Sequence, residues 1–155
     1  MLDDVRPIMP SLIRLIAGAI VLFVVQSIVL GLPGITGNLP NTTIPVNAFV
    51  GFTLGSVGAI VVLKFGTQLS NSIADTYRNY KAYVPLLTYF FQMAALWILY
   101  NASQAIASDF ITSAPWAYPL IFLGLAIMPT VKAVVNIVHA LEGHREEKHI
   151  LSRLN

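Results

Sequence analysis

The positions of the charged residues constrain the fold of this 155-residue chain more than any other feature. Only 10% of the residues are charged, and three long stretches carry no charge at all. These stretches are residues 15–63, 82–108 and 110–131. A soluble domain contains about 25% charged residues, so this chain has too few charges for a water-exposed surface. The sequence therefore predicts an integral membrane protein, formed as a single membrane domain over residues 1–155.

Four segments have the length and apolar character of membrane-spanning helices. About 20 mostly apolar residues are needed to cross a bilayer, and 56% of this chain is hydrophobic. The predicted spans are residues 11–31, 46–65, 83–106 and 116–139. We expect an all-α integral membrane fold in which four transmembrane helices form two helical hairpins.

The basic residues predict the orientation of these helices, because cytoplasmic flanks carry an excess of lysine and arginine. All nine basic residues fall on one side of the predicted membrane, and the loops over residues 31–45 and 108–115 contain none. The sequence therefore predicts a multi-pass protein of the cell membrane with both termini cytoplasmic. Asn41 begins an Asn-Thr-Thr glycosylation sequon on the outer side, a triplet that ordinary loop polarity also explains.

Two further segments are predicted on the cytoplasmic side. In residues 68–81, apolar and aromatic side chains recur at helical spacing, opposite polar positions such as Asn71 and Asp75. This pattern indicates either a short amphipathic helix at the inner interface or a cytoplasmic extension of the second span. The tail over residues 140–155 is predicted to form a cytoplasmic helix.

Glycines are concentrated in the second span, at Gly51, Gly55 and Gly58. Gly51 and Gly55 form a Gly-x-x-x-Gly pair, which allows another helix to approach closely. Two interpretations of these glycines are open. They pack against a neighbouring helix inside one four-helix bundle, or they line or close an oligomeric pore.

A local resemblance bears on the second interpretation. The sequence GTQLSN follows the glycine-rich stretch at residues 66–71. The whole segment Gly55–Ala74 resembles the pore helix of small-conductance mechanosensitive channels, in which a Gly/Ala-rich helix bends at a Gln-Gly-Ser-Leu-Ser-Asn-like stretch. The resemblance rests on the shared Leu-Ser-Asn triplet and covers 20 of the 155 residues. It implies that Gly55 and Gly58 line a pore and that Gly66 acts as a hinge.

Polar side chains within the spans are the remaining candidates for function. Lys64 and Lys132 lie near the inner ends of the second and fourth spans. They either extend their ammonium groups to the interface or form a basic inner mouth that favours anions or phosphate head groups. Lys132, Asn136 and His139 form one polar stripe, which we expect to face the inside of the bundle. Four other side chains are candidates for hydrogen bonds between helices: Gln26, Ser27, Gln92 and Asn101.

Few residues in the chain could support catalysis or metal binding. The chain contains no cysteine, and no predicted span contains an acid that could relay protons. His139, His144 and His149 are spaced five residues apart, so successive side chains rotate by about 140° on a helix and do not share a face. The sequence contains no phosphate-binding Gly-Lys-Ser/Thr loop and no Gly-x-Ser-x-Gly motif. We therefore expect no enzymatic activity, no metal and no cofactor, and a net charge of only +2 gives no reason to expect a nucleic-acid partner.

Two classes of function fit these observations. The first is a homo-oligomeric channel or passive transport protein with the second span nearest the pore axis. In that case Gly55, Gly58 and Gly66 allow close packing and bending, while Lys64 and Lys132 shape the inner mouth. The second is an accessory or structural subunit that packs against larger membrane proteins, a role that the aromatic third span favours. The expected partners are the lipid bilayer and either further copies of the chain or other membrane subunits.

Overall fold

The computed structural model describes residues 9–77 and 83–154, and most of these residues lie in four α-helices. The helices are α1 (Met9–Leu30), α2 (Val46–Thr76), α3 (Val84–Phe110) and α4 (Ala117–Leu154). Each helix contains a stretch that is long and apolar enough to cross a membrane. The predicted all-α fold with four apolar spans is therefore confirmed over the described residues.

Local sequence explains where these helices begin and how the first loop turns. Pro45 precedes α2 with an extended backbone (φ −66°, ψ 142°), and Pro85 lies in the first turn of α3, where its missing N–H group has no intrahelical partner to lose. In the loop between α1 and α2, Gly34 (φ 87°) and Asn41 (φ 60°) occupy the left-handed region. Glycine adopts that region freely, and asparagine tolerates it better than most residues do.

Helix α2 extends well beyond the predicted second span. It continues to Thr76 rather than ending near Phe65. Of the two structures expected for residues 68–81, the helical extension is therefore the one present as far as Thr76, while residues 78–82 lie outside the described part of the chain. Helix α4 likewise extends beyond the predicted fourth span and continues through most of the predicted tail, to Leu154.

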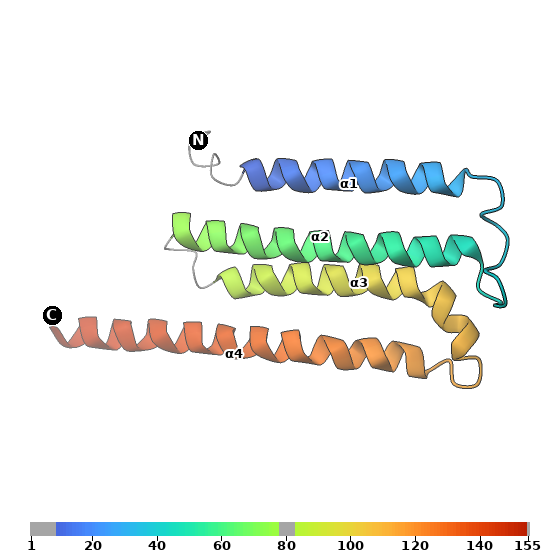
Figure 1. Cartoon of the computed structure of the whole chain (residues 1–155). Helices are drawn as coiled ribbons and strands as arrows, with labels where there is room; N and C mark the ends of the chain where they lie inside the picture. Colours follow the sequence, from blue (N-terminus) through green and yellow to red (C-terminus); the bar gives the residue numbers. More distant parts are fainter. Residues whose placement is uncertain (1–8, 78–82, 155) are drawn as a thin grey trace.

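The four helices lie side by side in chain order, and successive helices run antiparallel (Figure 1). The start of α1 and the end of α4 lie at the same end of the molecule. The most extensive contact joins α2 and α3, whereas α1 packs mainly on α2 and α4 mainly on α3. The described residues therefore form an open row of helices around a central α2–α3 pair. The pairing into two hairpins and the cytoplasmic location of the termini stay predictions.

The buried core is small and consists largely of small side chains. Ala59, Phe65, Ala95 and Ala133 are the buried hydrophobic residues of the described chain, and α1 contributes none. Small residues at a helix interface allow the backbones to approach closely. The rings of Phe65 and Phe91 meet edge to face, with centroids 5.3 Å apart. Most large apolar side chains point outward instead, as expected where lipid or other helices surround the protein.

Hydroxyl groups, rather than the predicted amides, connect neighbouring helices. The Thr88 hydroxyl of α3 donates to Ser70 Oγ of α2 over 2.9 Å, and Ser70 is only 2% exposed. Between α3 and α4, Ser103 Oγ lies 2.8 Å from the Tyr118 hydroxyl, which also donates to the carbonyl oxygen of Tyr100. These bonds link α3 to both of its neighbours.

Ser27 and Asn101, two of the candidates for hydrogen bonds between helices, instead bond within their own helices. Ser27 Oγ donates to the carbonyl oxygen of Phe23 over 2.8 Å, and Asn101 Nδ2 donates to the carbonyl oxygen of Trp97 over 2.8 Å. Both acceptors lie four residues earlier in the same helix. A short polar side chain reaches this carbonyl without any partner helix, so one of its hydrogen bonds is made within its own helix.

Candidate functional site

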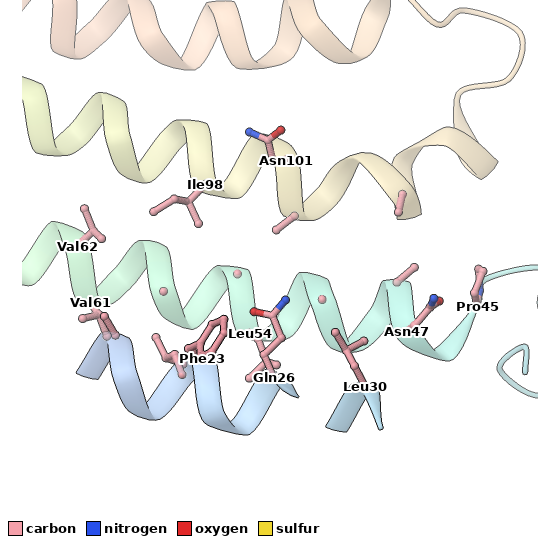
Figure 2. Close-up of a pocket in the computed structure, with 18 of the residues that line it drawn as sticks. Phe23, Gln26, Leu30, Pro45, Asn47, Leu54, Val61, Val62, Ile98 and Asn101 are labelled. Atoms are coloured by element: carbon pink, nitrogen blue, oxygen red, sulfur yellow. The ribbon is translucent and has the colours of Figure 1, made fainter. Parts of the chain in front are cut away.

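A groove of about 990 Å³ lies between α1, α2 and α3. Figure 2 shows its floor on α2, with α1 and α3 on either side. Gly51, Gly55 and Gly58 line this floor. Because glycine has no side chain, the groove reaches down to the backbone of α2 at Gly51 and Gly58, whereas Ala102 of α3 covers Gly55.

Two carboxamide side chains lie at the same level on opposite walls of the groove (Figure 2). Leu22 of α1 lies beside Gly58 of α2. Since α1 and α2 are antiparallel, Gln26, one turn after Leu22, is level with α2 near Gly55. On the other wall, Gly55 packs against Ala102, which directly follows Asn101. Gln26 and Asn101 therefore both border the groove near the middle of the uncharged part of α2, although the Asn101 amide projects from the side of α3 away from α2 (Figure 2).

The surroundings of these amides are unusual for the middle of an apolar span. The described residues offer the Gln26 amide no hydrogen-bond partner, and Asn101 bonds only to the Trp97 carbonyl of its own helix. An amide left unpaired in hydrocarbon costs several kcal/mol, roughly 4–8 on a cyclohexane scale. At this depth the groove is therefore chemically matched to water, to a polar solute or to another amide, and not to a lipid chain.

Polarity changes along the length of the groove. Asn47 and Ser108 line it at the end nearest the α1–α2 loop, and the two amides follow. At the opposite end its lining is aliphatic, from Leu15, Val61 and Val62. Within this groove the described lining residues include no ionisable side chain. The groove is thus polar and uncharged toward the α1–α2 loop and apolar at its opposite end.

The structure assigns different surroundings to the four glycines singled out in the sequence. A side chain at Gly55 would overlap Ala102, and one at Gly66 would overlap Phe91. Gly51 has open space above it, and a Cβ at Gly58 would lie 3.9 Å from Leu22 Cδ1. Helix packing within one chain therefore explains Gly55 and Gly66, whereas Gly51 and Gly58 leave space in the groove.

The helix is continuous through Gly66. The close contact with Phe91 explains why position 66 is a glycine, and this explanation does not require a bend in α2. The hinge that the mechanosensitive-channel resemblance implies stays a prediction.

The predicted basic residues lie outside the groove. Lys64 and Lys132 are both exposed. Lys132 lines a second cavity of about 270 Å³ between α2, α3 and α4, together with Gln92. The structure therefore does not bring the two lysines to one site within a single chain.

The polar stripe of α4 is exposed rather than enclosed within the chain, contrary to expectation, although Lys132 also borders the cavity between α2, α3 and α4. Lys132, Asn136 and His139 are all exposed. The reason is that α4 contacts α3 through a different face, where Thr130 lies 3.3 Å from the Tyr89 hydroxyl and Ala133 is buried. In an open row of helices, α4 covers only one of its faces.

Among the residues whose placement is described, no group of three His, Cys, Asp or Glu side chains could hold a metal ion. The side chains of His144 and His149 lie outside the described part.

Sequence reasoning missed Asn47 and Ser108 as groove residues and did not relate Gln26 to Asn101. The available signal was the rarity of polar side chains in uncharged spans. Their meeting at one level depends on how the helices are aligned, which no local pattern reveals. Comparison of the chain with known protein families, curated proteins and solved structures finds no match, so the geometry of the groove is the basis for a functional proposal.

Proposed function

We propose that this chain is a non-enzymatic, multi-pass membrane protein that forms a homo-oligomeric channel or passive transport protein, with the groove lining its pathway. The observation that carries the proposal is the pair Gln26 and Asn101, level with each other above a glycine floor. In a ring of copies with each groove turned to the axis, these amides meet water instead of lipid. Hydration would remove the cost of leaving them unpaired in hydrocarbon.

The lining of the groove supports passive movement rather than driven transport. Its polar groups are neutral amides and hydroxyls, and its lining has none of the carboxylate or imidazole groups that relay protons in pumps. The apolar inner end near Val62 would act as a constriction that controls hydration of the pathway. In the proposed orientation both termini are cytoplasmic in the cell membrane, the helices act as two hairpins, and Lys64 and Lys132 lie toward the cytoplasmic side but outside the groove.

The open arrangement of the helices supports association with further chains. Helix α1 has no buried residue, and α1 and α4 each rest mainly on one neighbour. A ring with cyclic symmetry would cover part of these surfaces with identical copies.

The test compares two glycines that both have open space above them, Gly51 in the groove and Gly124 on α4. Purified protein is sized in detergent and reconstituted in liposomes, and ion conductance and the flux of small neutral solutes are measured. Gly51→Leu should lower flux at least tenfold by filling the groove, and Gly124→Leu should leave it close to wild type. A silent wild-type protein, or equal flux for the two variants, would overturn the proposed pathway.

A second candidate function is that of an accessory subunit in a larger membrane complex. The specific observation in its favour is the aromatic surface of α3, where Phe90 is 65% and Trp97 67% exposed. Large aromatic side chains are enriched where proteins bind one another. Native purification distinguishes the two functions, because a subunit co-purifies with other membrane chains in fixed ratio, whereas a channel purifies as a ring of one chain.

A further inference from the structure

Two cationic side chains lie at the same level on neighbouring helices, on the side of the α1–α2 seam away from the groove. Gly18 faces Val61 across this seam, with Val61 Cγ1 3.7 Å from the position that a Cβ would take at Gly18. Arg14 lies four residues before Gly18, and Lys64 lies three residues after Val61. Because α1 and α2 are antiparallel, Arg14 and Lys64 are both displaced from this contact toward the same end of the helix pair. Their positions along the helix axes differ by only about 1.5 Å.

Neither cation is neutralised by the described part of the protein. Arg14 and Lys64 are both exposed, neither lines the groove, and no ion pair or hydrogen bond joins either side chain to a described residue. Like charges held at one level repel each other. An anion that contacts both cations would convert this repulsion into attraction.

The depth of this pair matches the phosphate layer of a bilayer. Lys64 follows Val46, the first residue of α2, by a helical rise of about 27 Å. This rise is close to the roughly 30 Å thickness of a hydrocarbon core. When the start of α2 lies at one interface, Arg14 and Lys64 reach the head groups at the other.

An apolar strip continues from the two cations toward the other end of the helices. On α1, Val21, Val25 and Ile28 follow Arg14 at intervals of 7, 11 and 14 residues, which keeps them on its face of the helix. On α2, Val57 and Ile60 precede Lys64 at intervals of 7 and 4 residues. All five strip residues are exposed. Paired cations above an exposed apolar strip fit a ligand with an anionic head and a hydrocarbon tail.

We propose that Arg14 and Lys64 bind the phosphate of an anionic phospholipid whose acyl chain lies along this strip. The planar guanidinium of Arg14 donates two parallel hydrogen bonds to phosphate oxygens, and the Lys64 ammonium contributes a point charge. This site is separate from the groove and does not depend on the proposed pathway.

The test measures lipid retention by native mass spectrometry of the purified full chain, with phosphatidylglycerol, phosphatidylcholine or inorganic phosphate added. We expect phosphatidylglycerol to be retained in preference to phosphatidylcholine. A basic residue near an anionic surface contributes about 1 kcal/mol, so Arg14→Gln and Lys64→Gln should each weaken phosphatidylglycerol binding about fivefold. Lys132→Gln, which removes the same charge from α4, should leave that binding unchanged.

Three outcomes would overturn the site. Equal losses for Lys64→Gln and Lys132→Gln would mean that net charge, not this pair, attracts the lipid. Equal retention of the two lipids would mean that the head-group charge is not recognised. Displacement of phosphatidylglycerol by equimolar inorganic phosphate would identify a free-anion site without a role for the apolar strip. Because the assay measures binding alone, it separates this site from the groove, whose test is flux.

Discussion

Gly66 of α2 and Phe91 of α3 lie in direct contact, and the aromatic side chain occupies the space that any side chain at position 66 would need. Phe91 also meets Phe65 edge to face. This contact helps to make α2 and α3 the closest pair of helices in the chain. Substitutions at the glycines therefore test the packing directly.

Gly66→Ala should destabilise the protein, although alanine is normally the better helix former by about 1 kcal/mol. The added methyl group overlaps Phe91 and forces the helices apart, at a cost of about 1–3 kcal/mol in the free energy of unfolding. Chemical unfolding in detergent micelles measures this change. Gly124→Ala, where the space is open, serves as the control and should be neutral or slightly stabilising. Equal effects at the two positions would contradict the close contact.

Gly55→Ala should be rescued by a compensating change on α3. A methyl group at position 55 overlaps Ala102, so the single variant should lose about 1–3 kcal/mol of stability. The double variant Gly55→Ala/Ala102→Gly restores the space and should recover at least about 1 kcal/mol relative to additive losses. Additive losses in the same unfolding assay would show that the two residues do not meet.

Ser70→Ala and Thr88→Ala test the hydrogen bond that joins α2 and α3. The two oxygens lie 2.9 Å apart, and Ser70 is almost completely buried. Hydrogen bonds between membrane helices contribute about 0.6 kcal/mol on average and at most about 1.7. A double-mutant cycle should therefore give a coupling energy of that size. The matched double-mutant cycle on Ser27 and Thr88, which share no hydrogen bond, should give no coupling energy.

Val62→Thr tests whether the apolar end of the groove limits the proposed pathway. Threonine is close to valine in size but adds a hydroxyl group, which favours hydration of an apolar constriction. Flux through reconstituted protein should rise several-fold. Val135→Thr on the exposed surface of α4 is the control and should leave the flux unchanged. An unchanged flux for Val62→Thr would exclude this part of the groove as the constriction.

The predicted orientation can be tested by labelling single introduced cysteines, because the chain has no native cysteine that would also react. Thr42 lies exposed in the α1–α2 loop and Asp75 lies exposed near the end of α2. A membrane-impermeant maleimide should label Thr42→Cys in intact cells and Asp75→Cys only after permeabilisation. The reverse pattern would contradict the orientation predicted from the basic residues.

Much of the helical layout could be predicted from the sequence, and the exceptions have physical causes. The spans were predictable because hydrocarbon excludes charge, so uncharged stretches such as residues 15–63 mark them directly. The continuation of α2 to Thr76 was less certain, since the polar residues beyond Phe65 suit either an extended helix or a separate one. Ser27 and Asn101 bond within their own helices because a carbonyl four residues earlier competes with any partner helix.

The sequence by itself determined the number of helices, their approximate lengths and the absence of charge from their central parts. These properties depend on composition within one segment, and a bilayer acts on each segment separately. Only the tertiary structure decided that Gly55 and Gly66 face α3, that Gly51 lies open, and that Gln26 is level with Asn101. The rotation and alignment of each helix depend on contacts between residues far apart in the chain, so they emerge only when the helices pack together.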